Sequence, residues 1–528
     1  MRLTDITKDK FDSANWIEKG FWLPQFDIKA VREKTFHHPT WVHFGGGNIF
    51  RAYLAAIVQN LLEGGEVDRG VIVAECFDTE LIEKAYHPHD NLCLLVVLKA
   101  DGTVEKRVIA SITESLRGDR SFPEEMKRLE DIFINSSLQM VSFTITEKGY
   151  LVSAEDLARG LTPEGVVGKV AKLLLRRFEA GAHPIAFQSM DNCAKNGDVL
   201  RDAIWVYGKA WVEAGLAPAE FLTYLQNQQL VSYPWSMMDK ITPLPSAEVQ
   251  QMLQKDGFQD TDIAVTKKGS FSCGFVNAEE TEYLVLEDNY PNGRPPLEKS
   301  GVLFAERETV ELVEKMKVGT CLNPLHTAMA IFGCLLGYTK ISDEMKDVDI
   351  VNLITKMATH EAIPVVRNPG IIKPEDFLES VLKKRLPNPF MPDSPQRIAT
   401  DTSQKLAIRF GQTIKAYLEQ GLSVEELTLI PLTLAAYVRY LTGVNDAGEP
   451  FELSSDPMLE ELREQISSLE VKAEPQDLSC LKGIYSREDL FGVDLYQAGL
   501  GEKIEKMVAQ LYWGEGAVRR TLYAYTND

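Results

Sequence analysis

Short apolar runs alternate with amphipathic helical patterns over the first 290 residues. The apolar runs predict buried strands at 41–44, 70–74, 92–98, 140–145 and 183–188. Helical patterns, for example at 49–62 and 163–180, separate several of these runs. Strands that alternate with helices indicate βαβ units and a mostly parallel sheet. Residues 92–99 and 103–109, joined by Ala100-Asp101-Gly102, favour instead a hairpin with an Asp-Gly turn.

The pattern changes near residue 290. The segment Asp288–Pro296 is dense in turn-forming residues and breaks any regular element. Beyond it, long amphipathic patterns predict helices at 305–317, 324–336, 403–420, 427–441 and 504–510. We therefore expect an α/β domain over residues 1–290 and a largely α-helical domain over residues 291–528.

Composition and charge exclude several classes of protein. The net charge of −21 argues against nucleic acid as a partner, because nucleic-acid binders carry basic patches. We expect no membrane span, since no run of about 18 uncharged apolar residues occurs. The charged segment Met1–Lys19 has no apolar core, so we expect no signal peptide. Seven scattered cysteines without a C-x-x-C pair are typical of free thiols in a cytoplasmic protein. The eight histidines show no metal-ligand spacing with nearby cysteines or carboxylates, so we expect no metal.

A glycine-rich loop follows the first predicted strand of this sheet. Gly45-Gly46-Gly47-Asn48 lies between that strand and a helical pattern that starts at Ile49. A strand, a glycine turn and a helix N-terminus together can hold the phosphates of a dinucleotide. Glu75 ends the next strand and Asp78 follows it; acids there accept bonds from ribose hydroxyls and repel a 2′-phosphate, which favours NAD over NADP. The alternative is a tight turn that packs a helix on a sheet.

The segment Glu314–His326 carries the second candidate cluster. Asn323-Pro324 is an N-cap and first-turn pair, so a helix is predicted to start there, with His326 on the same face as Asn323. Lys317 would end the preceding helix, and Glu314 shares its face. A desolvated lysine can act as a base, and an amide can stabilise a developing oxyanion. The alternative is a surface ion pair, a plain cap and a packed histidine.

Several motifs in order along the chain resemble one family. They are His43–Ala52, Thr144–Tyr150, Asp191-Asn192 with Asn196-Gly197, Tyr233–Pro243, and Arg397–Lys405. Together they resemble the polyol-specific long-chain dehydrogenases (the mannitol dehydrogenase family), nearest to its hexuronate-pathway branch. The resemblance implies an α/β Rossmann-type N-terminal domain that binds NAD, over residues 1–290, and an α-helical C-terminal substrate and catalytic domain, over residues 291–528.

The resemblance also implies roles for individual residues. Lys317 would be the general base; Asn192 and Asn323 would hold the reacting oxygen; His326 would orient the substrate, and Glu314 would assist proton exchange. Cofactor contacts would come from Gly45, Gly46, Gly47, Asn48, Ile49, Arg51, Glu75, Asp78, Thr144 and Thr146. Substrate contacts would come from Asp239, Arg385 and Lys405. No metal is needed, because the lysine and the amides replace a Lewis acid.

Two departures from the family pattern bear on these roles. Five residues separate Lys317 from Asn323, where the family usually has four. We expect a joint or π-bulge at Gly319-Thr320 to absorb the extra residue; otherwise Lys315 becomes the candidate base. Asp393 also stands where a lysine is often found, which alters contacts at the distal end of the substrate.

The expected activity is NAD-dependent interconversion of D-mannonate and D-fructuronate. The alternatives are a dehydrogenase of mannitol, of another polyol, or of the altronate/tagaturonate pair. A non-catalytic dinucleotide-binding module is a further alternative, which would need no Lys/Asn/Asn/His set. The resemblance implies a cytoplasmic monomer whose partner is a small sugar acid or polyol, with no nucleic acid and no membrane.

Overall fold

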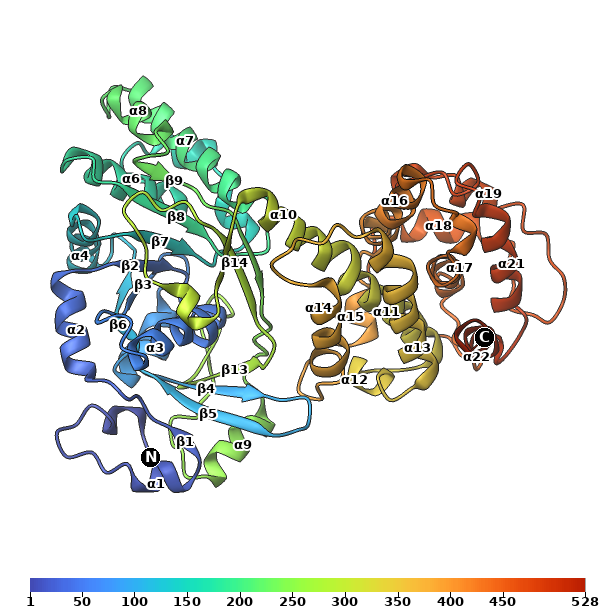
Figure 1. Ribbon diagram of the computed structural model, residues 1–528, viewed down its shortest axis with the longest axis horizontal. Coiled ribbons are helices and arrows are strands. Elements are labelled where there is room, and N and C mark those ends of the chain that lie inside the picture. The colour runs from blue at the N-terminus through green and yellow to red at the C-terminus, as the bar shows by residue number, and fades with distance from the viewer. Residues whose placement is uncertain (528) are drawn as a thin grey trace. The chain divides into compact units, whose positions relative to one another are not determined.

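The computed structural model describes residues 1–527. The chain divides into two compact units, Met1–Lys99 with Thr103–Glu311, and Ala100–Gly102 with Leu312–Asp528. The strands of every sheet lie in the first unit, and the second is built of helices (Figure 1). The α/β and α-helical character predicted for the two halves is therefore confirmed.

A parallel sheet forms the centre of the first unit. Its strands lie in the order β6-β3-β2-β7-β8-β9, and every neighbouring pair is parallel. Their bounds are β2 (Trp41–Phe44), β3 (Val71–Glu75), β6 (Ile112–Arg117), β7 (Met140–Phe143), β8 (Ile185–Ser189) and β9 (Val231–Ser232). This is the order of a doubly wound dinucleotide-binding sheet, in which the chain changes direction between β2 and β7. Sites in such folds lie at that switch point, beyond the carboxyl ends of the strands.

Helices cover both faces of this sheet, which explains why the strands are buried along their whole length and are mostly apolar. Trp41, Val71 and Val73 belong to one apolar cluster, together with residues of α3 (Ala55–Glu63). Their alternating neighbours, such as Phe44 and Ile72, belong to a second cluster on the other face. That cluster is completed by α4 (Pro123–Ile134), α6 (Val166–Glu179), α7 (Asn196–Glu213) and α8 (Glu220–Gln226).

Three smaller sheets complete the first unit, the smallest of them the antiparallel pair β11 (Ala264–Val265) and β12 (Phe271–Ser272). One has the order β1-β5-β4-β13, with β1 (Phe21–Trp22), β4 (Cys93–Leu98), β5 (Val104–Ile109) and β13 (Phe275–Glu279). The predicted hairpin is its β4–β5 pair, which is antiparallel, and Gly102 adopts the positive φ of +82° that the turn requires. The third sheet contains β10 (Ser236–Asp239), β14 (Tyr283–Glu287) and β15 (Leu303–Ala305). The remaining elements are α1 (Ala14–Glu18), α2 (Ile28–His37), α5 (Ala154–Ala158) and α9 (Ala247–Lys255).

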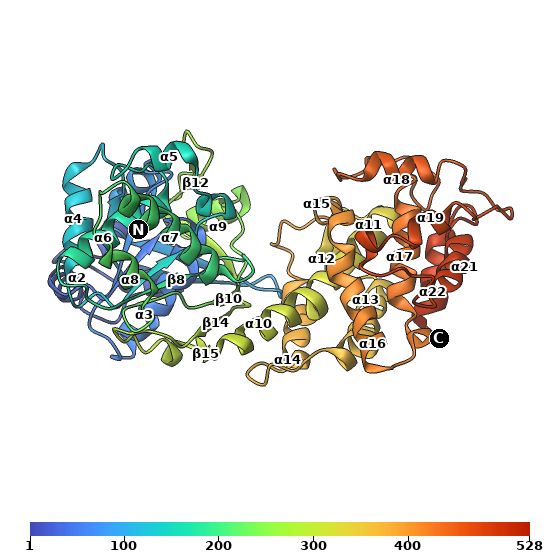
Figure 2. The same ribbon diagram turned by 90° about the horizontal axis from the view of Figure 1, so that it is seen from above.

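The second unit packs its helices around two apolar ones, α11 (Asn323–Leu336) and α17 (Leu429–Tyr440). Every residue of α17 is buried, and the helix packs against α11 and α21 (Figure 2). The other helices are α12 (Ile341–Glu344), α13 (Val348–Lys356), α14 (Pro374–Ser380), α15 (Pro395–Ala399), α16 (Gln412–Gln420), α18 (Leu459–Gln465), α19 (Leu481–Tyr485), α20 (Glu488–Phe491), α21 (Gly501–Leu511) and α22 (Ala517–Asn527). The helix predicted over 403–420 is present from residue 406, as the π turn η12 (Ala407–Gly411) followed directly by α16, whereas Thr402–Gln404 forms a separate 3₁₀ turn.

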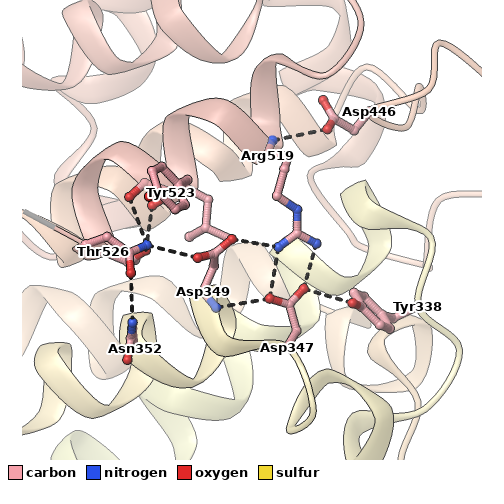
Figure 3. A network of polar contacts seen from close by, with 10 residues as sticks. Tyr338, Asp347, Asp349, Asn352, Asp446, Arg519, Tyr523 and Thr526 are labelled. Atoms are coloured by element: carbon pink, nitrogen blue, oxygen red, sulfur yellow. Dashed lines mark hydrogen bonds and ion pairs between the residues drawn. The ribbon is translucent and has the colours of Figure 1, made fainter.

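An ion-pair network attaches the last helix, α22, to α13 (Figure 3). Arg519 donates to both carboxylate oxygens of Asp347, at 2.9 and 2.6 Å, and to Asp349 at 3.0 Å. The Tyr338 hydroxyl also donates to Asp347, at 2.8 Å. Asp446 accepts from the backbone N–H groups at the start of α22, including that of Arg519 at 3.1 Å. The network holds the C-terminal helix through charge as well as apolar packing.

One helical stretch, Arg307–Leu336, runs for 30 residues through α10 (Arg307–Met316), a π turn and α11. Its length and its mean hydropathy of 1.3 over 18 residues would suit a membrane span, but 83% of that window is buried inside the protein. A mostly buried apolar helix of this kind is typical of a protein core. The turn in its middle carries the proposed base.

Candidate functional site

The glycine loop is clamped between the strands on either side of β2. Gly45 has a φ of +112°, and a Cβ atom there would lie 2.4 Å from the Thr144 carbonyl oxygen, so only glycine fits. The backbone N–H of Gly46 donates to the Glu75 carboxylate at 2.8 Å. The Gly46 carbonyl accepts from the Tyr86 hydroxyl at 2.6 Å. These contacts hold the loop at the switch point of the sheet.

The far side of the loop is open. Gly47 is exposed, and a Cβ atom added to it would meet no protein atom within 4 Å. The helix begins at Asn48, followed by half-buried Ile49, and its first turn after these residues is the π turn η2 (Phe50–Leu54). Open space beside a helix N-terminus leaves room and free N–H groups for a phosphate. The residues present therefore fit a dinucleotide, as the sequence predicted.

Glu75, which ends β3, and Asp78, which follows it, both bind groups of the protein itself. The buried Glu75 carboxylate accepts from Gly46 and also from the N–H groups of Phe77 (2.8 Å) and Asp78 (3.0 Å). Asp78 is buried and accepts from the Thr266 hydroxyl at 2.6 Å. Glu75 lies at the end of β3, where a ribose acceptor is expected. Asp78 is committed to the β11–β12 segment, so its proposed cofactor contact is less well supported than that of Glu75.

His43, a buried histidine that was not among the predicted contacts, supports the glycine loop. His43 lies on β2, bonded through Nδ1 to Ser142 Oγ at 2.7 Å and through Nε2 to Thr144 Oγ1 at 2.8 Å. Its ring stacks on Phe50 at 4.5 Å. Burial lowers the pKa of His43 to about 3, so the imidazole is neutral. Thr144 is thus fixed beside the loop, whereas Thr146 is exposed.

Arg51 is placed differently from the expectation. Its guanidinium is almost fully buried, donates to the Cys273 carbonyl at 2.7 Å and lies 5.7 Å from the Tyr86 ring. The Nε and Nη1 atoms have no hydrogen-bond partner within the described chain. The side chain binds the segment before β13, so a cofactor contact from this residue would come from its main chain.

The loop before α7 presents Asn192 to solvent. The neighbouring Asp191 accepts from the Tyr150 hydroxyl, from Ser189 Oγ at 2.9 Å and from the Cys193 N–H at 3.1 Å. Asn196 Nδ2 donates to the Asp191 carbonyl at 3.1 Å. These bonds fix the loop on both sides of the exposed Asn192. The other polar residues of the sequence motif, Asp191 and Asn196, therefore hold the backbone of the loop that carries Asn192.

Asp239 ends β10 and is buried. The next residue, Lys240, donates to the Glu279 carbonyl and to the Glu282 carboxylate, both at 2.7 Å. Burial, together with the nearby charges of Glu282 and Asp239, raises the pKa of Tyr53. Asp239 is therefore buried within the first unit, near Tyr53 and the Lys240–Glu282 ion pair.

The predicted π-bulge is confirmed in the second unit. Residues Lys317–Cys321 form the π turn η7, closed by the Leu322 N–H donating to the Lys317 carbonyl at 3.2 Å. An i→i+5 bond accommodates one more residue than an α-helical turn, which absorbs the extra residue in the motif. Lys317 is half-buried and Lys315 is exposed, which favours Lys317 as the base.

The structure corrects the predicted position of the N-cap of the helix that carries Asn323. The helix α11 begins at Asn323 and its cap residue is Leu322, so the N-cap predicted at Asn323 was wrong by one position. Pro324 lies in the first turn, as predicted. The Thr327 hydroxyl donates to the Asn323 carbonyl at 3.0 Å, and the Arg409 guanidinium donates to the Thr327 oxygen. Burial lowers the pKa of Arg409 to about 10. The two hydrogen bonds through Thr327 fix the backbone at Asn323, and they could not be predicted from the sequence.

His326 faces an unexpected carboxylate. Its Nε2 lies 3.9 Å from Asp393 Oδ2, and the two side chains are 12% and 7% exposed. Asp393 is also paired with Arg397. The residue noted as a departure from the family thus lies beside the proposed substrate-orienting histidine. Glu314 is half-buried one turn before η7.

The two basic substrate candidates differ in their surroundings. Arg385 is almost fully buried at the end of the π turn η10 (Val381–Arg385). Lys405 donates to the Ile398 carbonyl at 3.3 Å and to the Thr400 carbonyl, and therefore caps the end of α15. Burial and the nearby Arg409 lower the pKa of Lys405. Among residues 1–527, no group of three or more His, Cys, Asp or Glu side chains is arranged to hold a metal ion.

The strand order and the glycine loop at its switch point define the class: a Rossmann-type dinucleotide-binding protein with a second, helical unit. Family models describe the same two parts, the mannitol dehydrogenase Rossmann domain over residues 39–299 and the mannitol dehydrogenase C-terminal domain over residues 309–512. The chain belongs to the mannitol dehydrogenase family, as the sequence motifs indicated.

Individual relatives agree with this assignment. The chain is 49% identical to a D-mannonate oxidoreductase of Thermotoga maritima over 525 residues, 97% of each chain. A solved D-sorbitol dehydrogenase in substrate-free form matches with a TM-score of 0.75 at 24% identity, covering 95% of this chain and 97% of that one. Pseudomonas fluorescens mannitol 2-dehydrogenase, solved as a ternary complex with NAD and D-mannitol, matches with a TM-score of 0.67 at 25% identity, covering 96% and 97%.

Proposed function

We propose that the chain is an NAD-dependent oxidoreductase that interconverts D-mannonate and D-fructuronate. The observation that carries the proposal is the 49% identity, over 97% of both chains, to a protein named D-mannonate oxidoreductase. The open glycine loop of the first unit is further evidence for a dinucleotide cofactor. In the solved mannitol 2-dehydrogenase complex the cofactor is NAD. We propose the first unit as the cofactor-binding part and the second as the part that carries the base.

The cofactor would be held by the residues around the glycine loop. The N–H groups at Gly47 and Asn48 would meet the phosphates, and the Glu75 carboxylate would accept from a ribose hydroxyl. Ile49 and Thr144 flank this loop and would complete the contact surface, with Thr146 further out. When bound, NAD supplies the hydride acceptor.

The protein's own part of the reaction is proton transfer and orientation. In the oxidation direction, the Lys317 amine would take the proton from the secondary hydroxyl as the hydride leaves the same carbon. The Asn323 and Asn192 amides would donate to that oxygen as negative charge develops. The π turn supports this role. Although five residues separate Lys317 from Asn323, the turn keeps Lys317 in one helical stretch with Asn323 and His326.

The remaining residues have supporting roles in the proposal. His326, beside Asp393, would hold a substrate hydroxyl, and Glu314 would pass the proton between Lys317 and solvent. Asp239 and Arg385 would contact the rest of the substrate. Lys405 caps α15 through its ammonium, so the structure gives less support to its substrate contact than to that of Arg385.

A single assay tests the proposal. Purified protein is mixed with NADH and, separately, with fructuronate, tagaturonate and fructose, and NADH oxidation is followed by absorbance. We expect the highest kcat/KM with fructuronate. Turnover on none of these ketoses would refute the oxidoreductase and leave a dinucleotide-binding module, which NADH binding without turnover would identify. Turnover on fructose alone would replace the sugar acid by mannitol as the alcohol.

A polyol is the second candidate substrate. The match over almost the whole chain to the mannitol 2-dehydrogenase complex favours it. The replacement of a lysine by Asp393 at the distal end bears on the same choice, because a carboxylate there would repel an anionic substrate group and accept from a hydroxyl. D-mannitol and D-mannonate compared as reductants of NAD separate the two candidates directly.

A further inference from the structure

A cavity of about 270 Å³ lies in the first unit, between α7, α8 and the edge strand β9. Its floor includes Tyr233, its walls include Asp198, Asn289 and Arg307, and Trp205 and Arg201 lie near its mouth. None of the residues that line it belongs to the glycine loop or to the set proposed for the reaction. Tyr233 belongs to the sequence motif Tyr233–Pro243, but the proposed reaction uses only Asp239 of that motif.

Tyr233 brings a hydroxyl group to the cavity. The side chain is 6% exposed, and its ring stacks on Phe187 with a centroid distance of 5.9 Å. Within residues 1–527 the hydroxyl makes no hydrogen bond, and burial of the side chain raises its pKa, so it remains a neutral donor. A hydroxyl that is not bonded within the protein is available to donate to, and accept from, a molecule in the cavity.

Asn289 brings a second group with unused bonding capacity. Its main-chain carbonyl accepts from the Ser232 hydroxyl at 2.6 Å, which fixes the residue. Its carboxamide makes no hydrogen bond to any residue in the described part of the chain. A carboxamide offers two donor hydrogens and an acceptor oxygen. The cavity therefore presents both donors and acceptors on neighbouring walls.

The charged groups around the cavity are paired with one another, and the carboxylates outnumber the guanidinium groups by one. Arg201 donates to Asp198 at 2.8 Å and to Asp202 at 2.9 Å. Arg307 donates to Glu287 at 3.0 Å and to Asp198 at 3.4 Å. Two guanidinium groups thus face three carboxylates. An anion would meet no net positive charge here.

We propose that this cavity binds a neutral polyhydroxylated molecule of monosaccharide size, an open-chain polyol or a monosaccharide. Each hydroxyl both donates and accepts, which suits the Tyr233 hydroxyl, the Asn289 carboxamide and the Asp198 carboxylate together. The C–H edges of such a molecule pack on apolar surface, and the floor and Trp205 supply it. An apolar ligand would leave the polar groups unpaired. The proposal does not rest on the proposed reaction, because it concerns different residues.

The test uses the full-length chain labelled with 5-fluorotryptophan, without cofactor, so that no turnover occurs. The seven tryptophans give separate ¹⁹F signals, and the Trp205→Phe variant identifies the signal of Trp205. We expect this signal to move saturably as D-mannitol is added, and to stay in place when inorganic phosphate is added. Trp22, 65% exposed in the same unit, provides the control signal that should not move.

Tyr233→Phe then tests the named contact. The change removes only a hydroxyl that has no protein partner, so Tm should stay within about 2 °C. The dissociation constant for D-mannitol at the Trp205 signal should rise about fivefold, as expected for one lost neutral hydrogen bond. Tyr523→Phe, on the exposed face of α22, is the matched control and should leave binding unchanged. The proposal is overturned if D-mannitol and D-glucose produce no saturable shift, if phosphate alone produces one, or if Tyr233→Phe binds as tightly as the wild type.

Discussion

Replacing Arg519 by methionine should destabilise the helical unit by a measurable and pH-dependent amount. Arg519 is 37% exposed, but its partners Asp347 and Asp349 are 7% and 8% exposed. Methionine keeps much of the apolar stem and leaves both buried carboxylates without their cation. Breaking a fully buried pair costs about 3–5 kcal/mol. The partial exposure of Arg519 reduces this to about 2–3 kcal/mol, and Tm should fall by roughly 5–10 °C.

The pH dependence has a definite sign. Burial alone would raise the pKa of the Asp347 carboxyl, but the Arg519 guanidinium and the Tyr338 hydroxyl hold it below its ordinary value of 3.8. The stability from this carboxylate is therefore fully present above pH 3.8 and is lost as the pH falls through the folded-state pKa. The difference between wild type and variant should be largest near neutral pH and shrink in acid, where protonation removes the unpaired charge.

Urea unfolding followed by circular dichroism, at a series of pH values, measures this difference. Arg520→Met is the matched control, because Arg520 is exposed and donates only to the backbone carbonyls of Glu515 and Trp513. That variant should change the free energy of unfolding by less than about 0.5 kcal/mol. If Arg519→Met were no less stable than Arg520→Met at pH 7, or if their difference grew in acid, the reasoning on the buried pair would be refuted.

Three further predictions concern the proposed site. Lys317→Ala should lower kcat by about 10²–10⁴-fold and leave the dissociation constant for NADH unchanged in fluorescence titrations; near-normal kcat would move the base elsewhere. Gly47→Ala should keep Tm within about 2 °C but weaken NADH binding, since the new methyl enters open space beside the loop, whereas Gly45→Ala should lower Tm as well; equal effects of the two would contradict the cradle geometry. Thr327→Val removes the hydroxyl that joins Arg409 to the helix start and should lower kcat about tenfold with little change in NADH binding; loss of Tm with unchanged kcat would make its role purely structural.

Apolar runs predicted four strands of the main sheet, β2, β3, β7 and β8, because both faces of that sheet are covered, but no prediction was made for β6 and β9. The structure buries every residue of β2 and β7, including the polar His43 and Ser142, and their apolar residues divide between two clusters on opposite faces of the sheet. The same signal fails for β1 and β15, which have two and three residues and carry almost no period. At 403–420 the helical spacing is right from residue 406, but it does not show the π turn within that helix. The π turn η12 interrupts this segment at Gly411, which has no room for a Cβ atom against the Phe491 carbonyl.

The spacing of residues in the candidate site predicted its local backbone structure. Residue type alone did not predict which groups its charged side chains bind. The count of five residues after Lys317, compared with the four that are usual in the family, predicted a joint or a π-bulge, and the structure has the π turn η7 there. Residue type alone does not show when a charged side chain is bonded to the backbone: Arg51 binds a buried carbonyl and Lys405 caps a helix. Such commitments depend on partners far away in sequence, for example Cys273 for Arg51. They can be distinguished from ligand contacts only once the partners are known, and the groups left with free bonding capacity, such as the hydroxyl of Tyr233, then become the informative ones.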